Sequence, residues 1–339
     1  MRGRDPGPYH WQMTRVLSGV QPSGALHVGN YLGAMRQWAI DQYDADSFYC
    51  VVDLHGLTTD HDPVLLRQRT LETAIGLFAI GLDPDVCTVF IQSHVHEHAE
   101  LCWLLECTAT VGELGRMIQY KEKSAGKESV RAGLFTYPVL MAADILIYDA
   151  DRVPVGDDQR QHLELARDLA IRWNGRYGTT FVVPESSIPK VAARVMDLQH
   201  PERKMSKSVD SPLGTITVLD SPDAIAQKVR KAVTDTESRV RYDPVNAPGL
   251  SNLIELLSAT TGRPIADIVE SYEQYGPIKA DLADALVEAL SVVKTRYLEL
   301  SKDPGAIANS LLKGAEKAAV VASATLRRAK DAIGLLAPG

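Results

Sequence analysis

Two lysines stand three residues apart in a short polar segment beyond the middle of the chain. The segment reads Lys204-Met205-Ser206-Lys207-Ser208. Two ammonium groups on a serine-containing loop can converge on a polyphosphate as negative charge develops on its leaving group. Taken alone, the segment is equally compatible with a solvated surface loop, as most charged runs are. A second motif is needed to decide between the two interpretations.

That second motif is a turn after the first strand-like run of the chain. The run 15–20 is followed by Gln21-Pro22-Ser23-Gly24, and helical spacing begins near His27. The free N–H groups at a helix N-terminus bind phosphate, and a glycine there lets a ligand lie directly on the backbone. An ordinary strand-to-helix turn would explain this segment alone. Together with the lysine segment, it predicts a site for a nucleotide polyphosphate.

The elements that must position these motifs alternate along the first 200 residues. Strand-like apolar runs cover 15–20, 47–52 and 86–91, and segments with helical spacing lie between and after them. The later runs are apolar on both faces, as strands of a parallel sheet are. This order predicts a doubly wound, Rossmann-like α/β fold with ligands at the carboxyl ends of its strands.

Beyond residue 205 the pattern becomes helical and strand-like runs nearly vanish. The expected helices cover 224–233, 250–260, 265–272, 278–300 and 306–333. We therefore expect an N-terminal extension over 1–15, a Rossmann-like catalytic domain over 16–205, and an all-α domain over 206–339.

Composition and charge exclude several classes of protein. The 339 residues are 45% hydrophobic and 23% charged, which is typical of a globular chain. No apolar run is long enough to span a bilayer, the first residues lack the apolar core of a secretory signal, and four cysteines do not make a disulfide scaffold. We expect a protein of the reducing cytoplasm with no membrane partner.

The net charge of −7 argues against a protein that coats polyanions in general. A nucleic-acid partner would have to dock on local basic surfaces. The C-terminal stretch offers one candidate, with five cations against two anions: Lys313, Lys317, Arg327, Arg328 and Lys330 against Glu316 and Asp331.

The two motifs together resemble the signatures of the class I aminoacyl-tRNA synthetases. Residues 204–208 match the Lys-Met-Ser-Lys-Ser signature, and residues 22–30 match a variant of the His-Ile-Gly-His signature. Within the class, the chain is similar to the tryptophanyl-tRNA synthetases of bacterial type from about Val16 to its end, with family-like segments at 18–24, 121–128, 137–144 and 155–162. His27 departs from many bacterial relatives, which carry threonine there, although both side chains can donate to a phosphate.

The resemblance implies a tryptophan–tRNA ligase. Such an enzyme activates L-tryptophan with ATP to tryptophanyl-adenylate and transfers it to the 3′ end of tRNA(Trp). It also implies Mg²⁺ carried by the ATP phosphates, a helical domain that binds tRNA, and a homodimer. The ATP-binding residues it implies are Gln21, Pro22, Ser23, His27, Gly29, Asn30, Gly156, Asp157, Asp158, Val195, Lys204, Met205, Ser206, Lys207 and Ser208. The residues it implies for catalysis are Lys204, Lys207, Gln21, Lys123 and Lys127.

A tryptophan site is predicted on one helix face. Tyr137, Met141 and Asp144 fall at i, i+4 and i+7, so they share that face. Tyr137 and Met141 alone would suit a core stripe, but a buried carboxylate is costly without a partner. The indole N–H is only a donor and an ionised carboxylate only an acceptor, so we expect Asp144 to bind the indole. Met141 offers a polarizable wall to the ring. The resemblance adds Gln159 and Tyr137 at the substrate ammonium group, and His55 completes the predicted set.

Three other interpretations stay open at this point. His94, His96 and His98 alternate as zinc ligands can, but the sequence offers no convincing fourth ligand. A tyrosine-specific enzyme of the same subclass is the nearest rival to the tryptophan enzyme. A synthetase-like paralogue that binds tryptophan or tRNA in a regulatory role is the rival from another functional class, although the intact signatures argue against it.

Overall fold

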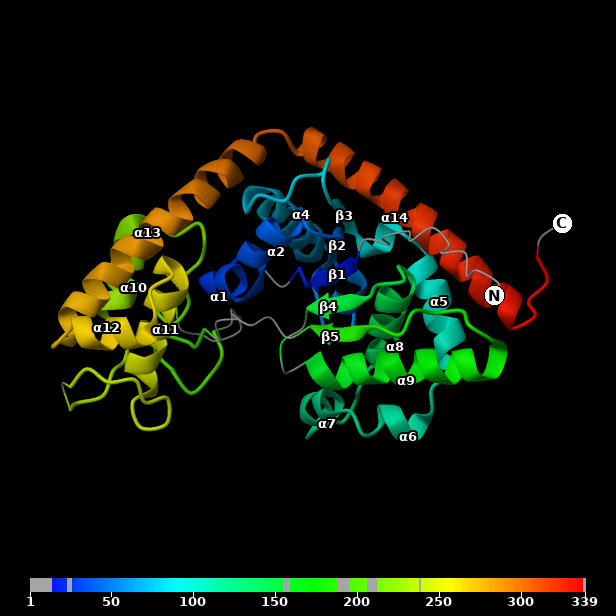
Figure 1. Cartoon of the computed structure of the whole chain (residues 1–339), viewed down its shortest axis with the longest axis horizontal. Helices are drawn as coiled ribbons and strands as arrows, with labels where there is room; N and C mark the ends of the chain where they lie inside the picture. Colours follow the sequence, from blue (N-terminus) through cyan, green and yellow to red (C-terminus); the bar gives the residue numbers. More distant parts are fainter. Residues whose placement is uncertain are drawn as a thin grey trace, which may run out of the picture.

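The computed structural model describes residues 14–22, 26–154, 156, 159–187, 195–205, 212–237 and 239–337. Its centre is a sheet of five strands in the order β3-β2-β1-β4-β5 (Figure 1). The strands are β1 (Arg15–Val20), β2 (Asp46–Val51), β3 (Thr88–Ile91), β4 (Arg152–Pro154) and β5 (Glu185–Ser187). All the neighbouring strands pair in parallel, so the predicted Rossmann-like α/β fold is confirmed. The strand order reverses between β1 and β4, where such sheets bind ligands.

Helices and helical turns cover both faces of the sheet. In β2, Tyr49 and Val51 belong to one apolar core, while Phe48 and Cys50 belong to the other. Because successive side chains of a strand point to opposite faces, this alternation places one core on each side of the sheet. The helical elements of this part are α1 (Val28–Asn30), a π-helical turn (Tyr31–Met35), α2 (Arg36–Asp41), α3 (Asp53–Gly56), α4 (Pro63–Ala79), a 3₁₀ turn (Gln92–His94), α5 (Glu97–Glu106), α6 (Val111–Leu114), α7 (Ile118–Ser124), α8 (Ala132–Leu146) and α9 (Arg160–Tyr177).

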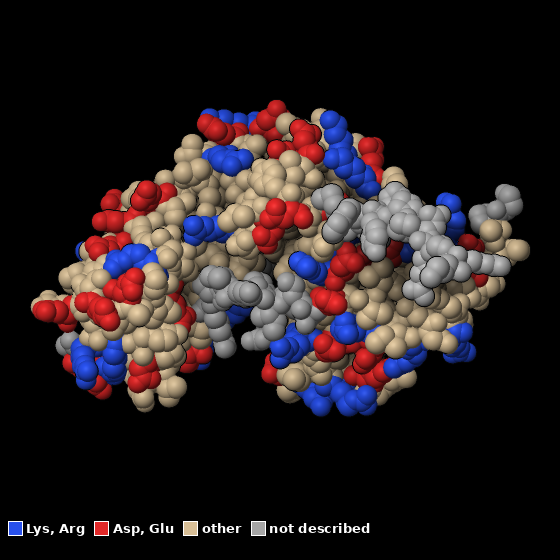
Figure 2. Space-filling view, viewed as in Figure 1, with Lys and Arg blue, Asp and Glu red and all other residues tan. Residues whose placement is uncertain are grey.

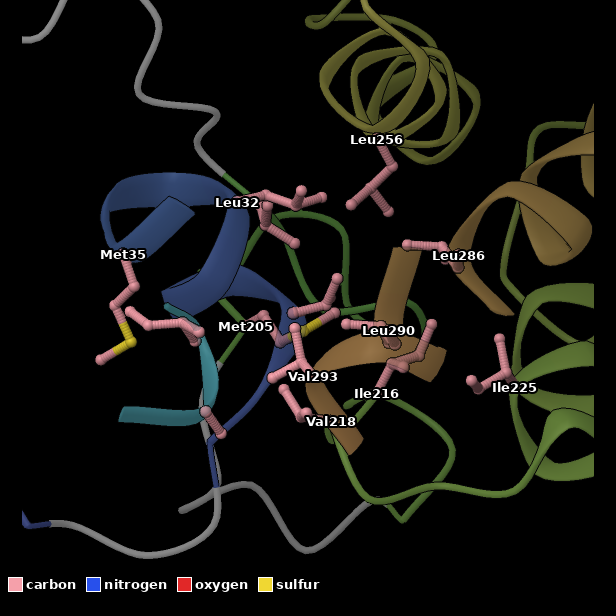
Figure 3. Packing of buried hydrophobic residues seen from close by; sticks show 14 of the residues in the cluster. Leu32, Met35, Met205, Ile216, Val218, Ile225, Leu256, Leu286, Leu290 and Val293 are labelled. Carbon is pink, nitrogen blue, oxygen red and sulfur yellow. The ribbon is translucent and has the colours of Figure 1, made fainter. Parts of the chain in front are cut away.

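The predicted helices of the C-terminal third are all present, within a few residues of their expected bounds. They are α10 (Pro222–Arg230), α11 (Pro248–Thr261), α12 (Ile265–Ser271), α13 (Tyr275–Leu300) and α14 (Pro304–Ala332). Helices α10 to α13 share an apolar core with α1, the π-helical turn and α2, which follow β1 (Figure 3). In that core Leu32 and Met35 lie in one cluster with Met205 and Leu290. No helix in the described part of the chain is both long enough and apolar enough to cross a membrane.

Helix α14 leaves the other C-terminal helices and packs along the sheet (Figure 1). Ala318, Ala322 and Leu326 belong to the core that contains Phe90 of β3. A Cβ atom on Gly314 would lie 1.9 Å from the carbonyl oxygen of Val89, so only glycine allows this close approach. Helix α14 therefore contacts both cores: Ile307 and Leu311 near its start belong to the core of α10 to α13, and its later small residues fit against β3.

Candidate active site

The predicted nucleotide residues lie at the reversal of strand order. Gln21 and Pro22 follow β1, and Gly156 follows β4, the strand that pairs with β1. Gln21 and Gly156 are exposed, while Pro22 is buried. The carboxyl ends of β1 and β4 thus place these residues where doubly wound sheets bind ligands. Ser23, Asp157 and Asp158 lie outside the described residues.

The turn after β1 is hydrogen-bonded to the segment that follows the lysine motif. The Val28 N–H donates to the carbonyl of Ile216 at 2.9 Å, and the Val218 N–H donates to the carbonyl of Leu26 at 2.8 Å. His27 and Thr217 form an antiparallel bridge between these two bonds. The two motifs, about 180 residues apart in sequence, are thereby joined through backbone pairing.

Gly29 lies where the first motif meets Val195. A Cβ atom at position 29 would lie 2.9 Å from His27 Nδ1 and 3.5 Å from Val195 Cβ. Asn30 Oδ1 accepts the His27 N–H at 3.4 Å, which ties the start of α1 together. The structure therefore brings His27, Gly29, Asn30 and Val195 into one neighbourhood, as the prediction of an ATP site requires.

The start of the lysine motif belongs to a short hairpin. Residues 195–197 pair with 203–205, and we call residues 195–205 the lysine hairpin. The Met205 N–H donates to the Val195 carbonyl at 3.0 Å, and Met196 and Lys204 form an antiparallel bridge. Met205 is buried in the core next to the sheet, while Lys204 is exposed. The hairpin thus anchors the motif through Met205 and presents Lys204 to solvent. Ser206, Lys207 and Ser208 lie outside the described residues.

Of the two predicted catalytic lysines in segment 121–128, Lys123 contacts Tyr137, one of the residues predicted to bind the tryptophan substrate. Its Nζ lies 5.6 Å from the centre of the Tyr137 ring and donates to Gln119 Oε1 at 3.3 Å. A cation over an aromatic face at this distance is attracted by the ring. Lys127 is exposed after the end of α7. Lys123 therefore lies beside Tyr137, which is predicted to bind the tryptophan substrate.

The centre of the predicted tryptophan site is the buried carboxylate of Asp144 on α8, which is 5% exposed. Its Oδ1 accepts from Gln92 Nε2 at 2.7 Å and is 2.6 Å from His98 Nδ1, while its Oδ2 is 2.8 Å from His55 Nε2. Burial by itself would raise the pKa of this carboxyl, but the hydrogen bonds from His55 and His98 together outweigh burial and hold the pKa well below its usual range. Asp144 is therefore an ionised, acceptor-only group at neutral pH.

Tyr137 is fixed about two turns before Asp144 on the same helix. Its hydroxyl donates to Gln119 Oε1 at 3.1 Å and lies 2.7 Å from His162 Nε2. Burial raises the pKa of this hydroxyl to about 12, so it stays protonated. Met141 between them is half-buried. The Gln159 N–H donates to the carbonyl of Gly156 at 2.9 Å, which links the predicted ammonium-binding residue to the nucleotide end.

Sequence reasoning missed five polar residues of this site: Gln92, His98, Tyr148, Gln119 and His162. Gln92 directly follows β3, so its place at a strand end could have revealed it. His98 was considered only as a zinc ligand. In the structure His98 is buried while His94 and His96 are exposed, and the described residues contain no group of three or more His, Cys, Asp or Glu that could hold a metal ion. The partner of His98 is instead the carboxylate of Asp144, 46 positions away in the sequence.

Comparisons with known proteins agree on the family of this chain. The family model described as "tRNA synthetases class I (W and Y)" matches residues 12–291. A curated relative from Streptomyces coelicolor, tryptophan–tRNA ligase 1, is 56% identical over 331 residues, which cover 96% of this chain and 98% of the relative. The crystal structure of tryptophanyl-tRNA synthetase from Mycoplasma pneumoniae has a TM-score of 0.88 and 35% identity, covering 96% of this chain and 98% of that one. The enzyme from Campylobacter jejuni, solved with ADP and tryptophan, has a TM-score of 0.80 and 34% identity, covering 95% and 100% of the two chains.

Proposed function

The chain belongs to the class I tRNA synthetases of the tryptophan and tyrosine family, and on this premise we propose how its residues carry out the tryptophan–tRNA ligase reaction. The carboxylate of L-tryptophan attacks the α-phosphate of ATP and yields tryptophanyl-adenylate and pyrophosphate. The 2′-hydroxyl of the terminal adenosine of tRNA(Trp) then takes the tryptophanyl group and releases AMP. The protein contributes positioning and electrostatic stabilisation to both steps.

The assignment of tryptophan as the amino-acid substrate rests on the number of hydrogen bonds that Asp144 accepts. An ionised carboxylate has about four acceptor sites, two on each oxygen. Among the described residues, Oδ1 has two partners, Gln92 and His98, and Oδ2 has one, His55. One acceptor site of Oδ2 is left for a ligand that brings a single donor. The indole N–H is such a donor, whereas the side chain of phenylalanine has no donor.

Residues around this carboxylate complete the amino-acid site. Met141 is placed on the same helix face to contact the indole ring, since a thioether packs well against an aromatic ring. Tyr137 and Gln159 are assigned to the ammonium group of the substrate. Two features support this assignment: Tyr137 is held by Gln119 and His162, and Gln159 is bonded to Gly156 at the nucleotide end.

The nucleotide end is assigned to ATP. The described polar side chains there include Gln21, Asn30 and Lys204, a donor set that suits phosphate oxygens. Mg²⁺ prefers phosphate oxygens and water as ligands, so it would arrive on the ATP and share charge neutralisation with Lys204 and Lys207. When pyrophosphate leaves, these lysines stabilise the charge that develops on it.

The test is ATP–pyrophosphate exchange measured with each of the twenty amino acids in turn. The proposal expects exchange with tryptophan, much less with tyrosine and least with phenylalanine. Exchange that is fastest with tyrosine would identify the rival enzyme of the same subclass. Tryptophan binding without any exchange would identify a regulatory paralogue and would overturn the proposed activity.

We also assign a homodimer to this chain. A pocket of about 150 Å³ between α3, α5 and α8 is lined by Leu54, Leu57, Thr58, Cys102, Gly133, Thr136, Tyr137 and Leu140. Leu57 on its wall is exposed, and Trp103, next to Cys102 on α5, is 64% exposed. We take the exposed apolar side chains of α3 and α5 as the candidate dimer interface, because exposed apolar surface can mark a protein interface. Trp103→Asp should dissociate the dimer in sedimentation experiments, whereas Ile171→Asp, at an exposed apolar residue of α9, should leave it intact.

The tRNA partner requires local basic surfaces, since cations and anions are interspersed over the face in Figure 2. On α14, two of the five expected cations are paired within the chain: Arg328 with Asp149 at 2.7 Å and Lys330 with Glu100 at 2.5 Å. Lys313 and Arg327 are exposed. We therefore assign tRNA docking to cations such as these, and the reaction to the cytoplasm, where tRNA is charged.

The tRNA assignment is tested by comparing salt dependence. The affinity for tRNA(Trp) should fall steeply with salt, because each phosphate contact releases counterions, while adenylate formation should respond much less. Lys313→Gln with Arg327→Gln should flatten the slope for tRNA binding and leave exchange unchanged. Equal slopes for both steps in the unmodified enzyme would contradict a separate electrostatic tRNA site.

A further inference from the structure

His98 connects the tryptophan-binding carboxylate to a buried tyrosine. The side chain lies at the start of α5 and is 0% exposed. Its Nδ1 is 2.6 Å from Asp144 Oδ1 and its Nε2 is 2.7 Å from the Tyr148 hydroxyl. Tyr148 is itself 0% exposed, with its ring 4.9 Å from that of Phe48 and 5.5 Å from that of Phe90. Neither nitrogen of His98 is therefore available to solvent.

The contacts determine which nitrogen of His98 carries the hydrogen. Asp144 is ionised and can only accept, so Nδ1 must donate to it. The Tyr148 hydroxyl stays protonated, because burial raises its pKa well above the usual range. Among the described residues, the only hydrogen-bond partner of this hydroxyl is His98 Nε2, at 2.7 Å. His98 thus donates from Nδ1 to Asp144 while the Tyr148 hydroxyl holds the opposite edge of the ring, and Asp144 keeps its negative charge.

The other donor to Oδ1 is fixed in the same manner. Gln92 is 0% exposed, and its Oε1 accepts the Leu54 N–H at 3.1 Å, which directs its Nε2 to Asp144. Helix α5 is in turn held by α14, since Ser323 donates to Glu97 and Lys330 pairs with Glu100. Both donors to Oδ1 are therefore oriented by a second contact, and they leave Oδ2 to His55 and the substrate.

We propose that His98 is a positioning residue for amino-acid selection, and that it fixes the Asp144 carboxylate so that the remaining acceptor site of Oδ2 serves the indole N–H. This inference rests on the proposed tryptophan–tRNA ligase activity and deepens it. His98 acts through Asp144 and needs no contact with the substrate. Loss of its Nδ1 donor lets the carboxylate turn within its site, and the advantage of tryptophan over phenylalanine falls.

The experiment compares variants that separate hydrogen bonding from packing. His98→Leu removes both hydrogen bonds at similar volume. His98→Asn keeps an N–H donor near the position of Nδ1 and removes the partner of Tyr148. Tyr148→Phe removes only the hydroxyl that orients the ring. Phe90→Leu is the packing control, because the Phe90 ring lies 6.0 Å from that of His98 and has no bond to Asp144. For each, ATP–pyrophosphate exchange gives kcat and KM for tryptophan, phenylalanine and ATP.

The expected result is a graded loss of selectivity. The ratio of kcat/KM for tryptophan to that for phenylalanine should fall at least about 10-fold in His98→Leu, as expected for a hydrogen bond to a charged group. The fall should be smaller in Tyr148→Phe, and His98→Asn should recover most of the ratio. The KM for tryptophan should rise while the KM for ATP stays constant. Phe90→Leu should lower the melting temperature without changing the ratio.

Two results would overturn the inference and leave the proposed function intact. One is a folded His98→Leu enzyme that keeps the selectivity of the unmodified enzyme. The other, if His98→Leu does not fold, is unchanged selectivity in Tyr148→Phe together with no difference between His98→Asn and Phe90→Leu. Failure of the unmodified enzyme to exchange pyrophosphate with tryptophan would instead contradict the proposed function.

Discussion

Two buried aspartates, one at each end of the site, are held in opposite ways. Asp144 at the tryptophan end accepts from side chains that lie 89, 52 and 46 positions away in the sequence. Asp197 in the lysine hairpin is 0% exposed, and its Oδ1 accepts the backbone N–H groups of Gln199 and His200, two and three residues on. Among the described residues, Asp197 Oδ2 has no partner, and a Cβ atom on Gly214 would lie 2.3 Å from it.

The difference between distant partners at Asp144 and local partners at Asp197 indicates that the two ends of the site have different roles. The proposed tryptophan end is assembled before the substrate arrives, because side chains from three other elements hold the Asp144 carboxylate and leave one acceptor site. Such preorganisation suits the choice between amino acids that differ by a single donor. The lysine hairpin is organised by a local turn and leaves Lys204 exposed, which suits the charge neutralisation that we propose for it. Variants at the two ends should therefore affect different kinetic quantities.

The largest effect is expected at the lysine motif. Lys207→Ala should lower the rate of ATP–pyrophosphate exchange about 100-fold, because one lost contact to the leaving group costs roughly 3 kcal/mol in the transition state. The KM for tryptophan and the preference over phenylalanine should stay near their original values. Lys302→Ala, at an exposed lysine after α13, is the control. An unchanged exchange rate would remove Lys207 from catalysis.

The complementary change is Asp144→Ala. It should reduce the preference for tryptophan over phenylalanine at least about 10-fold, because the indole N–H loses its acceptor. The KM for ATP should change little. Asp144→Asn tests the same point with the shape preserved, since its one oxygen is needed by the donors Gln92 and His98 and its amide nitrogen cannot accept the indole hydrogen. If both variants discriminate as well as the unmodified enzyme, Asp144 is not the indole partner.

A smaller effect is expected from Asp197→Ala. The two turn N–H groups lose their acceptor, so the free energy of unfolding should fall by about 1 kcal/mol in denaturant titrations. Exchange should slow less than in Lys207→Ala, and amino-acid preference should be unaffected. Asp197→Asn, which keeps an oxygen acceptor for Gln199 and His200, should restore most of the stability. A change in selectivity would show that the two ends are coupled.

The smallest effect concerns pH. The pKa of Asp144 is held below its usual range, so the carboxylate stays ionised and selectivity measured at pH 5, 6.5 and 8 should not change. A carboxyl whose pKa is lowered by folding contributes stability above its unfolded pKa of about 3.9, and this contribution is lost as pH falls toward the folded pKa. The stability difference between the unmodified enzyme and Asp144→Asn should thus be constant above about pH 5 and shrink in acid. A selectivity that falls between pH 8 and pH 5 would contradict this assignment.

The sequence by itself determined most of the elements. The spacing of apolar residues and local helix signals predicted β1 to β3 and all five C-terminal helices, because alternation, helical spacing and capping act over a few residues. The start of α4 is an example: Pro63 occupies its first turn and Asp62 accepts the N–H groups of Val64 and Leu65. The same local signals indicated Asp144, since a carboxylate on an apolar helix face requires a partner.

Only the tertiary structure decided which partners meet. Strands β4 and β5 have three residues each, too few for a period to show. The packing of α14 on β3 depends on Gly314 meeting the Val89 backbone, a contact across more than 200 residues. Asp144 could be recognised as needing donors, but Gln92, His55 and His98 become its donors only when the ends of β2 and β3 and the helix α5 come together beside α8. A local sequence pattern can indicate that a buried side chain such as Asp144 requires hydrogen-bond donors, but only the tertiary structure brings those donors to it.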